Sequence, residues 1–339
     1  MRCKDFLTIR DFSSDELRHF LDLARDIKAH PARFSESLAG KTLASLVTLA
    51  FVLVFNYFLF RVVAGDPVAN LFRGRNLSDS QKEELRQQFG LDGSQLEQFF
   101  RYLEQTVTLN FGRSYTSNEP VMSEIASRAW PTIALVGVSA VLSALIGVLL
   151  GVIAAWNRGR KSDYAATSFT MTTYSMPDFW LGMLLLVFFA VVLGWFPVGG
   201  LSDPNTPDEG IAYVIDVAWH MFLPALTLTL AYLGEYTLIM RSSLLDTMRE
   251  DYLVLARAKG LRDVVVRNRH AVPNAMLPVI TLVAINLGFV LSGAIAVETI
   301  YSWPGLGLVT YQALTGPDLP LLQGLFLVFS ASVIVFNFV

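Results

Sequence analysis

The sequence predicts an all-α, polytopic membrane protein with six transmembrane helices, and two observations support this fold class. First, 53% of the 339 residues are hydrophobic and only 16% are charged, whereas an ordinary soluble domain has about 25% charged residues. A soluble protein of this length needs more charge to cover its surface, so a cytosolic enzyme is disfavoured. Second, the chain contains apolar runs of about 20 residues, the helix length that crosses roughly 30 Å of hydrocarbon.

Six such runs are present, and each is expected to form one membrane-spanning segment. They cover residues 43–63, 131–156, 165–196, 221–240, 277–300 and 319–339. The third run is long enough to tilt or break, and Pro177 followed by Asp178 provides a reason for a break there. The sixth run reaches the last residue without a polar flank, so we expect that a short C-terminal tail is missing.

Lys and Arg in the short loops predict the orientation, because cytoplasmic loops are enriched in these residues. Loop 157–163 holds three of them and loop 241–273 holds seven, whereas loops 199–220 and 301–318 hold none. We therefore expect the first two loops in the cytoplasm and the other two outside. With six spans, both chain termini are then cytoplasmic.

The long segment between the first two spans is predicted to lie outside. Helical apolar spacing at 80–89 and 95–107 predicts two short amphipathic helices. They form either a cap over the first span or part of a docking surface for an external partner.

The first 40 residues are soluble in character. One helical face collects the apolar side chains Leu17, Phe20, Leu21, Ala24 and Ile27. Residues 1–46 resemble the start of an ornithine or aspartate carbamoyltransferase. The carbamoyl-phosphate loop that such an enzyme needs next is replaced by a membrane run, so no catalytic residue carries over. This stretch is either a fused leader or a chance amphipathic helix.

The chain thus divides into four parts. They are a soluble leader (1–40), a first transmembrane helix (41–64), an extracytoplasmic helical segment (65–129) and a transmembrane core (130–339) that contains the cytoplasmic loop 241–273.

No catalytic, metal or cofactor site is predicted. Cys3 is the single cysteine, and the four histidines are far apart in the sequence. The stretch 35–42 resembles a phosphate-binding loop, but Ser35 occupies the position of its first glycine. The net charge of −3 gives no basic field for nucleic acid.

The loop 241–273 predicts a short protruding helix. Ala-Arg-Ala-Lys-Gly at 256–260 reads as a helix with small residues that ends in a glycine turn. Gly260 permits a sharp turn, and small alanines let another protein surface approach closely. For Arg257 and Lys259 alone, retention of positive charge on the inside is an equally good explanation.

Several separated motifs point to a known family. They are GDP at 65–67, FGRSY at 111–115, ARAKGL at 256–261, RHA at 269–271, NAMLPVI at 274–280 and ETIYSWPGLG at 298–307. Because of these motifs, the chain resembles type I ABC-importer permeases of the dipeptide/oligopeptide/nickel family from about residue 43 onward. Gly260 and Pro273 stand thirteen residues apart, as in the cytoplasmic motif of that family. Only Ala256 matches its Glu-Ala-Ala element.

The resemblance implies the type I permease fold and a transport subunit without catalytic activity. ATP-driven import would translocate di- or oligopeptides that an external binding protein delivers; nickel chelates or glutathione are alternative substrates. The expected partners are two cytoplasmic ATPase subunits and a second permease subunit, which the family suggests is a paralogue. The expected location is the bacterial inner membrane. The ATPase-coupling residues would be Asp251, Tyr252, Ala256, Arg257, Ala258, Lys259 and Gly260.

A self-contained secondary transporter remains the rival hypothesis. It would predict internal repeats with paired broken helices, and only one candidate broken helix is found.

Three polar residues within the runs are candidates for the translocation path, because polar groups inside a bilayer tend to face a cavity or a partner helix. Asp178 could line the path or cap a broken helix. Asn286 could contact substrate or bond to another helix. Glu298 could line the path or simply be hydrated at the outer interface.

The second run contains a small-residue motif that permits close helix packing. Gly147 and Gly151 form a G-x-x-x-G pattern. The pattern predicts either packing within the chain or an interface with a second permease subunit.

Overall fold

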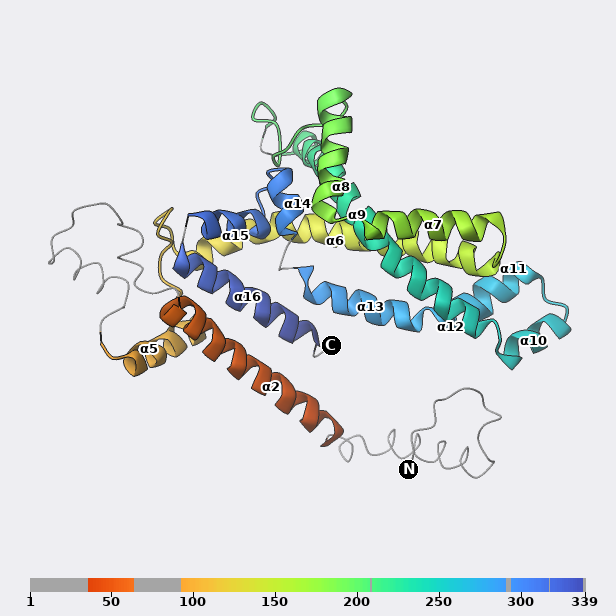
Figure 1. Cartoon of the computed structure of the whole chain (residues 1–339), viewed down its shortest axis with the longest axis horizontal. Coiled ribbons are helices and arrows are strands. Elements are labelled where there is room, and N and C mark those ends of the chain that lie inside the picture. The colour runs from red at the N-terminus through yellow and green to blue at the C-terminus, as the bar shows by residue number, and fades with distance from the viewer. Residues whose placement is uncertain (1–35, 64–92, 208, 291–293, 317, 338–339) are drawn as a thin grey trace.

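The computed structural model describes residues 36–63, 93–207, 209–290, 294–316 and 318–337. These residues are mostly helical, and the only β-pairing among them is an isolated bridge between Arg113 and Pro120. The predicted all-α class is confirmed (Figure 1). The leader up to residue 35 and the predicted amphipathic helix at 80–89 lie outside the described residues.

The chain order of the helices is as follows, with η marking π-helical turns. They are α2 (Glu36–Tyr57), η3 (Phe58–Val63), α5 (Gln95–Val107), α6 (Val121–Trp156), α7 (Lys161–Ser175), α8 (Asp178–Leu185), η4 (Leu186–Val192), α9 (Ile211–Thr247), α10 (Asp251–Ala258), α11 (Asp263–Val265), η5 (Val266–Ala271), α12 (Val272–Ala275), α13 (Leu277–Gly288), α14 (Ile295–Ile300), α15 (Leu306–Thr315) and α16 (Leu319–Asn337).

Helices α6 and α9 form the centre of the molecule and pack against each other more extensively than any other pair. The contact is close because Gly147 and Gly151 of α6 face α9. A Cβ atom at Gly147 would lie 2.5 Å from the Cβ of Tyr236, and one at Gly151 would lie 2.7 Å from the Cβ of Met240. The glycine motif therefore serves packing within the chain.

The third apolar run is broken where proline predicts it. Helices α7 and α8 are bent by 101° relative to each other. Pro177 is the N-cap of α8, and Asp178 is its first residue. Proline cannot continue the hydrogen-bonding of α7, so the chain changes direction there.

The fifth run is not one continuous helix, which corrects the expectation for 277–300. Helix α13 ends at Gly288, and α14 begins at Ile295. Gly288 packs closely on α16, where its added Cβ would lie 3.3 Å from the Cβ of Phe336. The Ser332 hydroxyl also donates a hydrogen bond to the Gly288 carbonyl at 3.2 Å. Glycine weakens a helix, and Gly288 is the last residue of α13.

Among the described helices, α6, α9 and α16 are long and apolar enough to cross a membrane, and the bent pair α7–α8 makes a fourth candidate. Shorter apolar stretches occur at Val47–Phe60 and Leu277–Asn286. The chain is thus a multi-pass membrane protein, and the number of six spans stays a prediction.

The predicted helix at 95–107 is present as α5. Ser94 caps it, and its side chain and that of Glu97 form a reciprocal capping box. The Tyr57 hydroxyl of α2 donates a hydrogen bond to the Gln95 carbonyl at 2.8 Å, and Tyr57 packs edge-on against Phe99. Helix α5 therefore covers the end of α2, as the cap interpretation predicts.

Candidate functional site

Helix α10 forms the predicted elbow and lies at the end of the molecule opposite to α5 (Figure 1). It has eight residues, and Gly260 follows with a φ of +73°. This left-handed conformation is accessible to glycine without strain. The Gly260 N–H donates to the Arg257 carbonyl at 2.9 Å, which closes the turn.

The two faces of α10 differ in burial. Leu253 and Ala256 are buried and belong to one apolar core with Leu244 of α9. Ala256 thus uses its small size against its own chain. On the other face, Val254 and Leu255 are 58% and 56% exposed.

The cationic and small residues of the predicted elbow are on its surface. Arg257, Ala258, Lys259 and Gly260 are exposed, as is Asp251 in the first turn of α10. The outer face therefore combines an apolar surface with a basic edge, which suits contact with an acidic or amphipathic partner surface.

Hydrogen bonds hold the elbow in place against α12. Asn274 of α12 donates from Nδ2 to the Tyr252 hydroxyl at 3.0 Å and to the His270 carbonyl at 2.7 Å. Partial burial raises the pKa of the Tyr252 phenol. Of the predicted coupling residues, Tyr252 is therefore anchored rather than free.

A second anchor joins the elbow to the end of α6. Trp156 donates from Nε1 to an Asp263 carboxylate oxygen at 2.9 Å. Arg257 lies over the Trp156 ring, 5.8 Å from its centroid, and its Nε is 3.7 Å from Asp263. Sequence reasoning missed Trp156 and Asp263, because no local spacing relates residues 107 positions apart.

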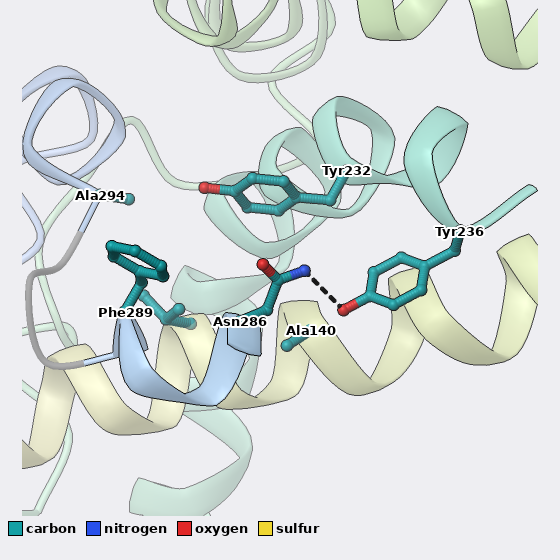
Figure 2. Close-up of a pocket in the computed structure, with 7 residues that line it drawn as sticks. Ala140, Tyr232, Tyr236, Asn286, Phe289 and Ala294 are labelled. Atoms are coloured by element: carbon teal, nitrogen blue, oxygen red, sulfur yellow. Dashed lines mark hydrogen bonds between the residues drawn. The ribbon is translucent and has the colours of Figure 1, made fainter. Parts of the chain in front are cut away.

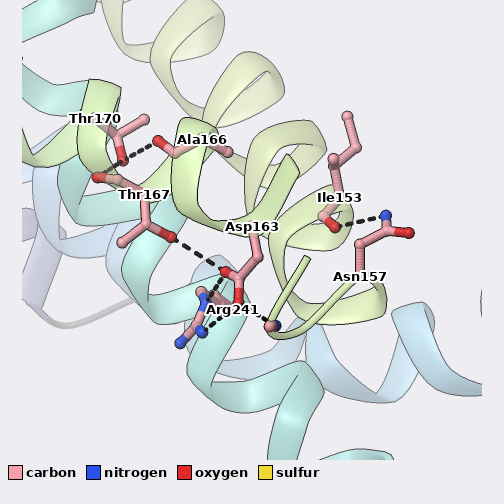
Figure 3. Close-up of polar contacts among 8 residues, drawn as sticks. Ile153, Asn157, Asp163, Ala166, Thr167, Thr170 and Arg241 are labelled. Atoms are coloured by element: carbon pink, nitrogen blue, oxygen red, sulfur yellow. Dashed lines mark hydrogen bonds and ion pairs between the residues drawn. The ribbon is translucent and has the colours of Figure 1, made fainter. Parts of the chain in front are cut away.

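A buried ion pair ties the inner end of α9 to the start of α7 (Figure 3). Arg241 donates from Nε and Nη2 to the two carboxylate oxygens of Asp163 at 2.8 and 3.0 Å. The Gly159 N–H and the Thr167 hydroxyl also donate to this carboxylate. Asp163 is almost fully buried. Its negative charge is balanced by Arg241, and its oxygens accept hydrogen bonds from groups of the same chain.

A cavity of about 320 Å³ lies between α6, α9, α13 and the start of α14 (Figure 2). Its walls consist of Val136, Ala140, Tyr232, Tyr236, Asn286, Phe289 and Ala294. Asn286 donates from Nδ2 to the Tyr236 hydroxyl at 3.0 Å. Asn286 thus makes the helix-to-helix bond and also borders a cavity, and its contact with substrate stays a prediction.

Asp178 lies at the break between α7 and α8 and does not line this cavity. Its Oδ1 accepts a hydrogen bond from the backbone N–H of Phe179 at 2.7 Å. The carboxylates of Asp178 and Glu235 are within electrostatic reach of the Tyr232 hydroxyl. Asp178 is therefore a neighbour of the cavity rather than part of its wall.

Glu298 is fully buried, so the expectation that it is hydrated is wrong. It accepts hydrogen bonds from the Thr132 hydroxyl at 3.0 Å and from the Leu308 N–H at 3.1 Å. It also stands outside the cavity wall. Glu298 joins α6, α14 and α15, and the expectation that it lines the path is not supported by its surroundings.

One apolar core connects the elbow with the cavity. It contains Leu253 and Ala256 of α10, Leu244 and Met240 of α9, and reaches Tyr236 in the cavity wall. The same core includes residues of α12 and α13, the helix that carries Asn286. The helices that carry Tyr236 and Asn286 therefore both belong to the core against which α10 packs.

No group of three or more His, Cys, Asp or Glu within the described ranges is arranged to hold a metal ion.

Comparisons with known proteins identify the family. Residues 147–339 match the family described as binding-protein-dependent transport system inner membrane component, and residues 35–136 match its N-terminal model. The chain is 37% identical over 301 residues to the glutathione transport system permease protein GsiC of Escherichia coli K12, covering 88% of this chain and 93% of the relative. The corresponding protein of Salmonella paratyphi A is 36% identical over 300 residues, with the same coverage.

A solved structure shows the same fold. A chain of the MetNI methionine ABC transporter, in an inward-facing conformation, has a TM-score of 0.51 with 18% identity. The match covers 65% of this chain and 94% of that one. Together these findings show that the chain belongs to the inner membrane components of binding-protein-dependent transport systems and is a permease subunit of an ABC importer, not an enzyme.

Proposed function

We propose that this permease subunit imports short peptides and that α10 is the element through which a cytoplasmic ATPase drives the transport. The observation that carries the proposal is the exposed outer face of α10 on a helix whose inner face is packed into the core. The exposed apolar face of α10 can bind a partner protein. Because the inner face is packed into the core, a movement of that partner would also move the helices around α10. The proposed contact consists of the exposed residues Asp251, Tyr252, Val254, Leu255 and 257–260, whereas the buried Ala256, expected from the sequence to touch the ATPase, supports the helix from inside.

The proposed assembly contains a second permease subunit, which is a paralogue, two ATPase subunits and an external binding protein. The basic loops at 157–163 and 241–273 support a cytoplasmic position for α10. With six spans, this orientation places both termini in the cytoplasm and α5 on the outer side of the bacterial inner membrane.

Short peptides are the substrate class that fits best. The relatives named above are permeases for glutathione, a tripeptide. The cavity is lined by neutral side chains and contains none of the carboxylate, imidazole or thiol groups that would hold nickel directly. Direct coordination of nickel by this wall is therefore disfavoured, and nickel chelates remain the alternative substrate.

The test combines capture of the ATPase with substrate uptake in cells lacking the chromosomal copy. Leu255→Asp places a charge on the outer face of α10, whereas Leu109→Asp makes the same change at a residue with similar exposure, 57%, far from α10. We expect Leu255→Asp to lose both the captured ATPase and the uptake of labelled glutathione and trialanine. Leu109→Asp should keep the ATPase. Normal capture and uptake in Leu255→Asp would contradict the coupling role, and uptake of Ni²⁺ without peptides would contradict the substrate.

A further inference from the structure

The cavity wall has two chemically different parts. Tyr232, Tyr236 and Asn286 supply neutral hydrogen-bonding groups, and the other four residues are apolar (Figure 2). None of the seven side chains is charged. These seven side chains themselves offer no ion pair to the charged ends of a peptide, so the polar recognition that they provide addresses neutral groups.

The three polar side chains offer both kinds of hydrogen bond. The Tyr232 side chain is 40% exposed, and its hydroxyl has no hydrogen-bond partner among the residues that the structure describes. The Tyr236 hydroxyl accepts from Asn286, so its own proton can still be donated. The amide oxygen of Asn286 points away from Tyr236 toward the side of Tyr232 (Figure 2).

We propose that this cavity is a peptide-bond subsite, in which the hydroxyls of Tyr232 and Tyr236 each donate to a substrate carbonyl and the Asn286 amide oxygen accepts from a substrate N–H. The inference rests on the proposed import of short peptides. Every peptide presents these two groups whatever its side chains, so the subsite recognises the class of substrate without selecting its sequence or charge. A volume of about 320 Å³ is at the lower end of the range of small-molecule sites, about 300–1,000 Å³.

The position of the subsite connects it to the energy source. Tyr236 is on α9 and Asn286 is on α13, and the core that packs against α10 includes both helices. A relative movement of α9 and α13 would change the spacing between the Tyr236 hydroxyl and the Asn286 amide. The two groups would then no longer match one peptide bond, and the peptide would be released.

The experiment uses the complete transporter in proteoliposomes, with binding protein saturated by trialanine or by trialanine N-methylated at its central peptide bond. Uptake and ATP hydrolysis are both measured for wild type, Tyr232→Phe and Asn286→Ala. Tyr311→Phe is the matched control, because Tyr311 is 46% exposed on α15 and outside the cavity wall. Binding-protein-stimulated ATP hydrolysis reports that each variant is assembled.

We expect Tyr232→Phe to lower trialanine uptake about five-fold per ATP hydrolysed, the effect of one hydrogen bond of about 1 kcal/mol. Tyr311→Phe should leave uptake unchanged. Wild type should transport trialanine faster than the N-methylated peptide, and Asn286→Ala should reduce that preference. If Asn286 had only a structural role, Asn286→Ala would lower the uptake of both peptides by the same factor.

The proposal is overturned if Tyr232→Phe transports at the wild-type rate, or if the preference for the unmethylated peptide survives in Asn286→Ala. Failure of the proposed substrate class looks different, because wild type itself would then transport neither peptide.

Discussion

At the scale of single residues, Glu298 explains why glycines occur in the segment that follows it. A Cβ atom at Gly305 would lie 2.5 Å from a Glu298 carboxylate oxygen, and one at Gly307 would lie 2.9 Å from it. Only glycine leaves room for the backbone of this segment to approach the buried carboxylate. The two glycines of the Trp-Pro-Gly-Leu-Gly stretch therefore make room for the Glu298 carboxylate and for its hydrogen-bond partner Thr132.

The ion pair between Asp163 and Arg241 gives a prediction about stability. Replacing Asp163 with Asn leaves Arg241 without its bidentate partner in a partly buried position. Breaking a buried pair on one side costs about 3–5 kcal/mol, and the 27% exposure of Arg241 places the expected loss at the low end, about 3 kcal/mol. Thermal unfolding in detergent measures it.

A double-mutant cycle separates this interaction from other effects. The double variant Asp163→Asn, Arg241→Gln should lose less free energy of unfolding than the two single variants lose together. Additive costs would show that the pair contributes no interaction energy.

At the scale of helices, the contact of α6 with α9 gives a second prediction. Gly147→Val would place a branched side chain against Tyr236 and the backbone of α9, so we expect destabilisation of about 1–3 kcal/mol or more. Gly137→Val is the matched control in the same helix, because nothing lies within 4 Å of a Cβ there. Equal unfolding temperatures for the two variants would refute the close contact.

Local sequence patterns predicted some elements well. Proline marked the break before α8, glycine marked the end of the elbow, and apolar spacing marked α5. The interruption between α13 and α14 was missed because hydropathy stays high through it. The last residue of α13, Gly288, packs against α16, a contact with a segment remote in sequence that no local pattern reveals.

The candidate site was predictable only in part for the same reason. Asn286 was identified because an amide inside an apolar run needs a partner. Tyr232 and Tyr236 were not, because tyrosine is unremarkable in a membrane helix and only the approach of α13 turns them into a cavity wall. The partners Asp163 and Arg241 are 78 positions apart, so no spacing rule relates them.

At the scale of the whole molecule, the elbow and the cavity are two ends of one apolar core. Anchors from Trp156 and Asn274 fix α10 to the ends of α6 and α12. In the proposed coupling role, a partner that binds α10 would act on the cavity through this core. This account depends on the ATPase touching the outer face of α10.

The most direct test is a cross-link from that face in the complete transporter, with Cys3→Ser as background and a thiol-attached photoreactive group at Leu255→Cys. We predict that light links Leu255→Cys to the ATPase subunit and that addition of ATP changes the yield. The same group at Leu109→Cys, on the opposite end of the molecule, should give no ATPase product. An ATPase product from Leu109→Cys and none from Leu255→Cys would contradict the account.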